Sequence, residues 1–255
     1  MKRIRLCETD IKSIKEYDWI KYFEYNNSHL LKIDFNNSRE LSEDEIKLIT
    51  PSIRAFQIGE GSEGRHLTKC VKKFSIKTGY KEYKTIMKWF VLEENRHSQT
   101  LKKYMDIYHI EPAKKLWIDN VFRLLRKLMG LECEIIILVT AEMIALSYYT
   151  ALSHAVNSEV LSIICQQMLN DELKHVVLQS ATLHRISVGR YNTINHLIRF
   201  MRKIIMRSTV FVVWHKYKAL FLRGNYPYKK FKNHCMEYLK ESIQIENTGD
   251  FYEKT

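Results

Sequence analysis

Helix breakers are scarce in this sequence. Its 255 residues include 3 prolines and 8 glycines, and 45% of the residues are hydrophobic. A many-turned β-sandwich or barrel needs more glycine and proline than this, and a disordered chain contains fewer apolar residues. The composition therefore excludes general disorder and predicts an all-α fold, with long helices around one sizeable core or two small ones.

Paired cysteines are also missing. The chain has five cysteines, an odd number, and no two of them form a Cys-x-x-Cys pair. This usage suits a reducing cytoplasm better than a disulfide framework, and it leaves no rubredoxin-type electron centre. We expect a cytoplasmic protein with inert thiols at Cys7, Cys70, Cys133, Cys165 and Cys235.

The sequence lacks a long uninterrupted apolar run. Its most apolar stretch, residues 135–152, is interrupted by Thr140, Glu142 and Ser147, and the basic residues after Met1 lead into no hydrophobic signal core. We therefore expect no membrane span and no export. Because no Gly-x-Gly-x-x-Gly motif follows a strand, nicotinamide and flavin are not expected as bound cofactors.

Acidic residues are outnumbered by basic ones. The chain has 41 lysines and arginines against 29 aspartates and glutamates, a net charge of +12 with a pI near 9.3. An anionic partner such as nucleic acid, a membrane surface or an acidic carrier protein fits this charge, although a solvated basic surface explains it more simply. A candidate anion-binding face lies near the C-terminus, at Arg199, Arg202, Lys203, Arg207, Trp214, Lys216, Tyr217, Lys218 and Arg223.

Turn and cap signals divide the first half of the chain. Residues 1–41 have no sustained period and predict an irregular arm that wraps the rest. A capping box at Ser42 and Glu45 and a proline at position 51 predict a helical stretch that begins at about residue 43 or 51. We expect this stretch to run to about residue 78, before Gly79. A second helix is expected over about 80–108.

The sequence of the second half of the chain predicts further helices. After Pro112, the apolar period predicts one very long helix over 115–155, or two in line through Gly130. Asn157 and Ser158 are expected to end this helical stretch and to cap the next helix. Three more helices are expected over 159–187, over 191–222 and, a short one, after residue 227. We expect a single structural domain with an arm (1–41), a four-helix bundle (42–189) and added C-terminal helices (190–255).

Two copies of a Glu-x-x-His motif are the most informative feature. They are Glu94 with His97 and Glu172 with His175. Helical residues three apart lie on one face about one turn apart, so each pair can bind the same metal ion. An acid also precedes each motif glutamate and a base precedes each histidine, which argues against chance repetition.

The two motifs occupy matching places in two helical hairpins. In each hairpin a single glutamate and the motif glutamate are nearly equidistant from the turn, so that folding back brings both carboxylates to the same height. In one hairpin, Glu142 and Glu172 each lie 15 residues from Asn157 at the turn. In the other, Glu63 lies 16 residues before Gly79 and Glu94 lies 15 residues after it. Pairing segments 63–97 and 142–175 predicts a four-helix bundle with six inward ligands.

This ligand pattern is typical of carboxylate-bridged di-iron or di-manganese sites in helical bundles. Carboxylates are hard donors that can bridge two cations, and one imidazole per metal leaves coordination positions open for dioxygen. Four acids buried without a metal would be costly, so ordinary packing does not explain them. The expected metal ligands are Glu60 or Glu63, Glu94, His97, Glu142, Glu172 and His175.

At these motifs the sequence resembles the ferritin-like di-iron carboxylate superfamily, over about residues 51–188. Its redox members include rubrerythrins, multicomponent monooxygenases, acyl desaturases and arylamine N-oxygenases. The resemblance implies a ferritin-like bundle that holds two iron ions, or manganese or a mixed pair. It also implies that Glu93 and Asp171 are partners of the ligand histidines. Arylamine N-oxygenases have an additional ligand histidine where this chain has Met168, so N-oxygenation is one candidate among several.

The glutamate of the first helix is ambiguous, because Glu60, Glu63 and His66 lie on one face at steps of three. Hairpin symmetry favours Glu63, because its counterpart in the second hairpin is Glu142. The counterpart of Glu60 would be about Val139, which cannot bind a metal ion. Rubrerythrin-like proteins are similar in having two glutamates three apart, so Glu60 is an alternative ligand that would move in with redox state. His66 is an extra ligand or a proton relay in one interpretation, and a hydrogen-bonded core histidine in the commoner one.

The expected function is a dinuclear non-haem iron oxidase or oxygenase that uses dioxygen or peroxide to oxidise or hydroxylate an organic substrate. The expected partners are a small-molecule or carrier-bound substrate and a separate electron donor; nucleic acid is less favoured, and a homodimer stays open. One alternative is a ferroxidase, iron-handling or peroxide-scavenging protein with the same ligands. Another is a basic protein that binds nucleic acid or a carrier protein and contains a structural metal.

Overall fold

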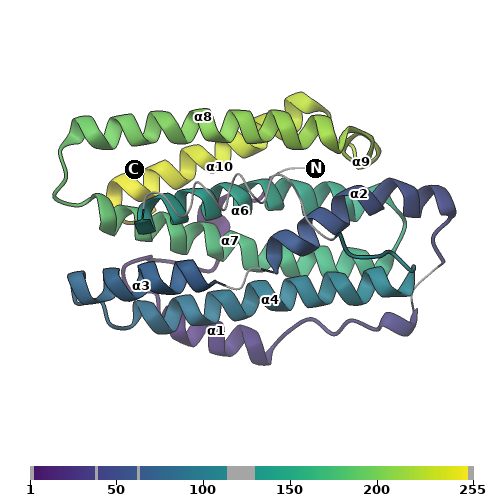
Figure 1. Cartoon of the computed structure of the whole chain (residues 1–255), viewed down its shortest axis with the longest axis horizontal. Helices are drawn as coiled ribbons and strands as arrows, with labels where there is room; N and C mark the ends of the chain where they lie inside the picture. Colours follow the sequence, from purple (N-terminus) through teal and green to yellow (C-terminus); the bar gives the residue numbers. More distant parts are fainter. Residues whose placement is uncertain (1–2, 38–39, 62–63, 114–129, 252–255) are drawn as a thin grey trace. The chain divides into compact units, whose positions relative to one another are not determined.

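Every regular element in the described part of the chain is helical. The computed structural model describes residues 3–37, 40–61, 64–113 and 130–251, and these ranges contain no strand (Figure 1). The all-α prediction is therefore confirmed. The α-helices are Trp19–Ser28 (α1), Glu43–Glu60 (α2), Arg65–Thr78 (α3), Tyr83–Ile107 (α4), Gly130–Ala155 (α6), Glu159–Ser187 (α7), Asn192–Lys216 (α8), Lys218–Arg223 (α9) and Tyr228–Thr248 (α10), with 3-10 turns at Leu6–Glu8 and Phe35–Asn37.

The chain forms two compact units. Unit 1 comprises residues 1–17, 135–154 and 168–255, and unit 2 comprises residues 18–134 and 155–167. The predicted arm, bundle and C-terminal segment follow a different division, which stays a prediction.

In unit 2, α1, α2 and α3 pack against α4 (Figure 1). The predicted capping box starts α2. The Ser42 hydroxyl accepts a hydrogen bond from the backbone N–H of Glu45 at 3.3 Å, and the Glu45 carboxylate accepts one from the N–H of Ser42 at 2.9 Å. These reciprocal bonds satisfy two N–H groups that the first helical turn would otherwise leave without an acceptor.

The predicted helix over residues 43–78 is interrupted, so the expectation of one continuous helix was wrong. The helical run stops at Glu60 and resumes at Arg65. Gly64 has a φ of +59°, and a Cβ added there would lie 3.0 Å from the Val91 side chain. Left-handed backbone and close packing on α4 both favour glycine at this position, and both end the regular helix.

In unit 1, α10 connects two other helices through buried polar side chains. Ser242 on α10 and Ser180 on α7 share a hydrogen bond with 2.6 Å between their hydroxyl oxygens. Glu246 on α10 forms an ion pair with Arg202 on α8. Figure 1 shows α8 and α10 side by side. Since all four side chains are buried, these bonds fix the register of α10 against both neighbours.

The N-terminal segment packs on the end of the chain within unit 1. Arg3 donates to Glu237 at 2.9 Å and pairs with Glu241, and the N–H of Ile14 donates to Asp250 at 2.9 Å. These contacts hold the first residues of the chain against α10 and Asp250, and the arm over residues 1–41 stays a prediction. The expectation that residues 1–41 are irregular throughout was wrong, because they include α1.

The predicted ends of the later helices are confirmed in part. α7 has the predicted bounds, and its cap residue Ser158 accepts a hydrogen bond from the N–H of Leu161 at 3.2 Å. The helix predicted over residues 191–222 is two helices, separated at Tyr217. The final helix, α10, has 21 residues and is not short. The predicted stretch 115–155 lies partly outside the described residues, and α6 begins at Gly130.

Among the described residues, α6 alone has the length and apolarity of a membrane span, with a mean hydropathy of 1.8 in its most apolar window. However, 83% of that window is buried inside the protein. A core helix of a soluble protein has this pattern. The prediction of no membrane span agrees with this burial, and the cytoplasmic location stays a prediction.

Two of the cysteines are fully buried and hold their protons. Burial raises the pKa of the Cys235 thiol to about 12, and burial also raises the pKa of Cys165 well above its usual value. Because the thiolate is the reactive species, both side chains are inert near neutral pH.

We predict that Gly224→Ala destabilises the protein. A Cβ at this position would lie 2.8 Å from the carbonyl carbon and 3.0 Å from the Cα of Ala151, which are backbone atoms that cannot move away. The expected loss is about 1–3 kcal/mol in the free energy of unfolding, measured by urea denaturation. Gly59→Ala is the control: nothing lies within 4 Å of its added Cβ inside α2, so it should gain up to about 1 kcal/mol. Equal stability of the two variants would contradict this packing.

Candidate metal centre

A first group of potential ligands lies in unit 2. It consists of Glu60, the last residue of α2, and Glu94 and His97 on α4. Their ligand atoms all lie within 4.8 Å of one another. His97 Nδ1 is 3.9 Å from a Glu60 oxygen and 3.8 Å from a Glu94 oxygen, and each residue is at most 9% exposed. We call these residues the α2–α4 triad.

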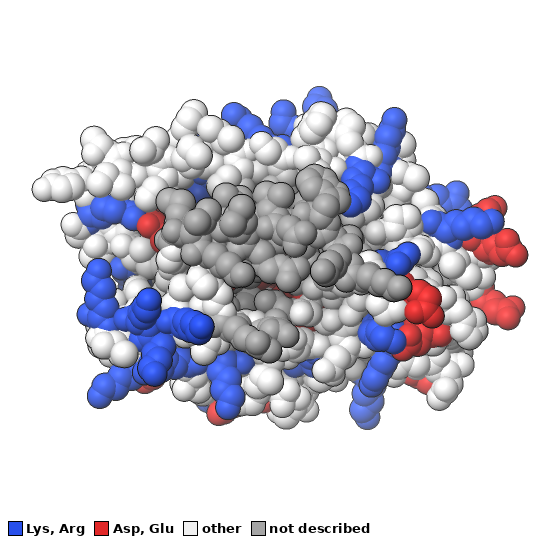
Figure 2. All heavy atoms as spheres, viewed as in Figure 1, with Lys and Arg blue, Asp and Glu red and all other residues white. Residues whose placement is uncertain are grey.

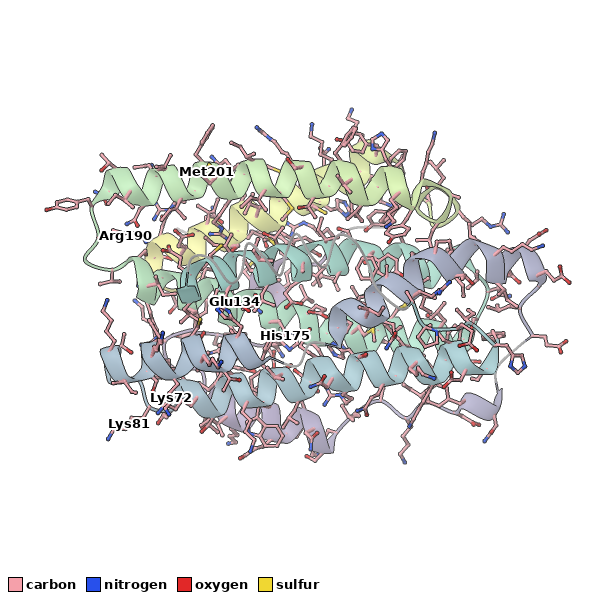
Figure 3. The ribbon with its side chains drawn as sticks, viewed as in Figure 1. Lys72, Lys81, Glu134, His175, Arg190 and Met201 are labelled. Atoms are coloured by element: carbon pink, nitrogen blue, oxygen red, sulfur yellow. The ribbon has the colours of Figure 1, made fainter. Side chains whose placement is uncertain are left out.

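A second group of the same composition lies in unit 1. It consists of Glu142 on α6 with Glu172 and His175 on α7, and its ligand atoms also lie within 4.8 Å of one another. His175 Nδ1 is 3.1 Å from a Glu172 oxygen. All three are at most 4% exposed, and His175 is labelled in Figure 3. We call these residues the α6–α7 triad.

Helix geometry accounts for both triads. In α4 and in α7 the Glu-x-x-His residues lie one turn apart on one face, as the sequence predicts. In each unit a neighbouring helix supplies the third residue, a single glutamate. Each triad therefore offers two carboxylates and one imidazole within reach of one cation, in surroundings with little water.

Among the described residues that follow Ser42 in this half of the chain, the structure places Glu60 with the α4 motif. Glu63 lies outside the described residues. The hairpin symmetry that favoured Glu63 assumed a helix continuous to residue 78, and the end of α2 at Glu60 removes that assumption. Glu60 is therefore the α2 glutamate whose position supports metal binding, while a role for Glu63 stays a prediction.

The glycines beside Glu60 have the spacing of a dinucleotide-binding loop. They are Gly59, Gly61 and Gly64. In that motif the first glycine follows a strand and the last opens a helix that receives the pyrophosphate. Here the helix α2 runs into them, so the arrangement does not fit a dinucleotide.

The acid before the first motif is held by two other helical residues. Glu93 accepts a hydrogen bond from Arg96 at 2.6 Å, one turn further along α4, and another from the side-chain amide of Asn26 on α1. Glu93 is buried. These contacts tie α1 to the face of α4 next to the ligand residues. The predicted contact of Glu93 with a ligand histidine stays a prediction.

The acid and base of the second motif have different surroundings. Asp171 is 1% exposed, and its predicted role beside a ligand histidine stays a prediction. Lys174 forms an ion pair of 2.6 Å with Asp10 in the N-terminal segment of unit 1. The base before each histidine therefore neutralises an acid outside its triad.

His66 pairs with a glutamate. Its Nδ1 lies 2.8 Å from a carboxylate oxygen of Glu134, a buried residue on α6 that is labelled in Figure 3. The His66 side chain is 33% exposed, so this histidine is hydrogen-bonded but lies at the edge of the core. Its role as an extra ligand or a proton relay stays a prediction.

Sequence reasoning missed Gln179 and Asn26. The Gln179 amide donates a hydrogen bond of 3.2 Å to Glu142, across from α7 to α6. Gln179 follows His175 by four residues, so its place on the ligand face of α7 could have been recognised from the helical period. Asn26 lies in a segment without a clear period, and no local signal indicates its contact.

We predict that Glu172→Gln removes a metal-dependent gain in stability. Mn(II) or anaerobic Fe(II) at about 100 times its Kd should raise the unfolding free energy of the wild type by about 3 kcal/mol, because only the folded chain assembles the ligands. The variant should lose most of this gain while its metal-free form is at least as stable, since a buried charge is removed.

Thermal unfolding with and without metal measures this difference. Glu43→Gln is the control, because the Glu43 side chain is 88% exposed on α2. An equal metal-dependent shift in both variants would argue against Glu172 as a ligand.

Comparison with known proteins does not assign the chain to a family. No protein-family model, curated protein or solved structure matches it. The interpretation of the site therefore depends on its own residues.

Proposed function

We propose that this protein is a ferritin-like dinuclear non-haem iron oxidase or oxygenase, in which the α2–α4 and α6–α7 triads together hold two metal ions. The observation that carries the proposal is the repetition of one buried set, a single glutamate with a Glu-x-x-His pair, in each unit. The joining of the two triads is part of the proposal. It rests on the hairpin repeat of the sequence and on the ligand pattern of di-iron bundles.

The charge of each triad suits a divalent cation. Two carboxylates compensate two positive charges, and the imidazole adds a neutral donor. Buried carboxylates are costly unless a cation or several hydrogen bonds compensate them. Four glutamates and two histidines that are each at most 9% exposed are therefore better explained by metal binding than by packing.

The bound irons would supply the electron-transfer chemistry by which dioxygen or peroxide is reduced and an organic substrate is oxidised. The chain supplies position and surroundings. Gln179 holds one oxygen of Glu142, which limits the ways in which this carboxylate can rotate. The low exposure of the α6–α7 triad excludes bulk water from the ligand face of α7.

Electrons would come from a separate donor or from the substrate. The described helices show no nucleotide-binding strand–loop–helix, and the sequence has no Cys-x-x-Cys pair for an iron–sulfur relay. The substrate would be a small molecule or a group attached to a carrier.

We predict that protein loaded anaerobically with Fe(II) binds about two irons per chain. After exposure to oxygen, Mössbauer spectra should show two magnetically coupled ferric ions. Glu94→Ala and Glu172→Ala each remove a ligand from a different triad, so either variant should abolish the coupling if the triads share one site.

Other outcomes distinguish the alternatives. Two uncoupled irons would contradict a joint site, and less than about half an equivalent of any transition metal would contradict the whole proposal. Steady turnover of Fe(II) to ferric mineral, with no oxidised organic product from any electron donor, would assign the protein to the iron-handling class. Glu43→Gln again serves as the control variant.

A further inference from the structure

Helix α8 exposes an apolar face to solvent. Six large apolar side chains on it are 40–61% exposed: Ile194, Leu197, Phe200, Met201, Ile204 and Phe211. Four of them, at positions 194, 197, 201 and 204, follow steps of three or four residues and so form one stripe. We call these six residues the outer face of α8; Met201 is labelled in Figure 3. Scattered apolar residues are normal on a protein surface, but a continuous stripe marks an interaction site.

The opposite side of α8 buries a charge. Arg202 is fully buried, pairs with Glu246 on α10 and donates a 2.8 Å hydrogen bond to Ser242. Arg199 also donates to Glu246, at 3.0 Å. A surface helix normally buries its apolar side and exposes its charges. Beside Arg202, α8 also buries Met206, Val210, Val213 and Trp214. The helix is therefore apolar on both sides, and the outer apolar side indicates an apolar partner.

The charge around the outer face is of one sign. Lys203, Arg207 and Lys216 are exposed on the same helix. The chain contains no acidic residue between Glu172 and Glu237, so α8 and α9 carry no acidic side chain. In Figure 2 the edge along α8 is accordingly white and blue. A partner of this surface combines an apolar region with negative charge.

We propose that the outer face of α8 binds the surface of an anionic lipid bilayer. An interfacial helix lies in the membrane plane, with apolar side chains at the acyl boundary and lysine and arginine at the lipid phosphates. From residue 194 to residue 211 the stripe is about 25 Å long, at 1.5 Å per residue. The distribution of apolar and basic side chains on α8 meets both requirements, and it involves none of the proposed metal ligands.

Two other partners fit the surface less well. A second copy of the chain would bring basic residues against basic residues, with no acid on either helix to balance them. Nucleic acid would be contacted mainly through its phosphates, and aliphatic side chains such as Ile194 and Met201 gain little there. An anionic bilayer is attracted by the charge and also covers the apolar stripe.

Vesicle sedimentation tests the proposal with the full chain. The wild type should co-sediment with vesicles of equal parts phosphatidylglycerol and phosphatidylcholine, and at least tenfold less with phosphatidylcholine alone. Phe200→Glu/Ile204→Glu should reduce the partition coefficient on anionic vesicles by more than tenfold. Lys203→Glu/Arg207→Glu should reduce it by about tenfold or more, because each basic residue near the surface contributes to binding.

Matched variants separate the outer face of α8 from general electrostatics. Ile76→Glu changes a 69% exposed apolar residue on α3, and Lys72→Glu/Lys77→Glu makes the same change in net charge on that helix. Both should bind vesicles as the wild type does. All substituted side chains are exposed, and circular dichroism melting verifies that each variant folds.

Three results would overturn the proposal. One is the absence of co-sedimentation of the wild type with either vesicle. Another is an equal loss of vesicle binding in the α3 variants and the α8 variants. The third is a stable dimer in sedimentation velocity that Phe200→Glu/Ile204→Glu dissociates, without any lipid binding. Iron content of the same variants should be unchanged, so that failure here and failure of the proposed metal site are distinguishable.

Discussion

The burial of carboxylates inside helical units is the constraint on which this molecule depends. Glutamates on α2, α4, α6 and α7 are almost completely removed from water, each with a histidine nearby. Such groups are tolerated only where charge or hydrogen bonds compensate them. Gln179 donates to one of them, and the basic residues beside the motifs are occupied elsewhere, Arg96 by Glu93 and Lys174 by Asp10. A pair of divalent cations is the compensation that we propose for the carboxylates of both triads.

A second buried charge determines how α8 is oriented. The guanidinium of Arg202 is held by Glu246 and Ser242 of α10, and removing it from these partners would leave an uncompensated charge in the core. With that side of the helix fixed, the residues on the opposite side have to face outward, including Phe200 and Ile204. The ion pair and the buried side chains of Met206, Val210, Val213 and Trp214 together fix the inner side of α8. The apolar stripe on the outer side gives unit 1 a surface of a kind that a solvated bundle does not need.

Local signals predicted much of the fold, and tertiary contacts account for what they missed. The capping box at Ser42, the cap at Ser158 and the Glu-x-x-His spacing act within one or two helical turns, so they could be read directly. The interruption before Gly64 depends on close packing against Val91, which no local pattern reveals. The pairing of His66 with Glu134, and of Glu93 with Asn26, joins residues far apart in the chain.

The interruption between α2 and α3 also bears on the charge of the candidate site. Because α2 ends at Glu60, this carboxylate lies at the negative end of the helix dipole, where an anion is disfavoured and a cation is favoured. A buried glutamate in that place is expensive on two counts, desolvation and the dipole. A metal ion bound by Glu60, Glu94 and His97 would relieve both at once, whereas a neutral hydrogen-bond donor would relieve only part of the first. The position of the helix end, which the sequence pattern misjudged, is therefore an independent physical argument for a cation in the α2–α4 triad.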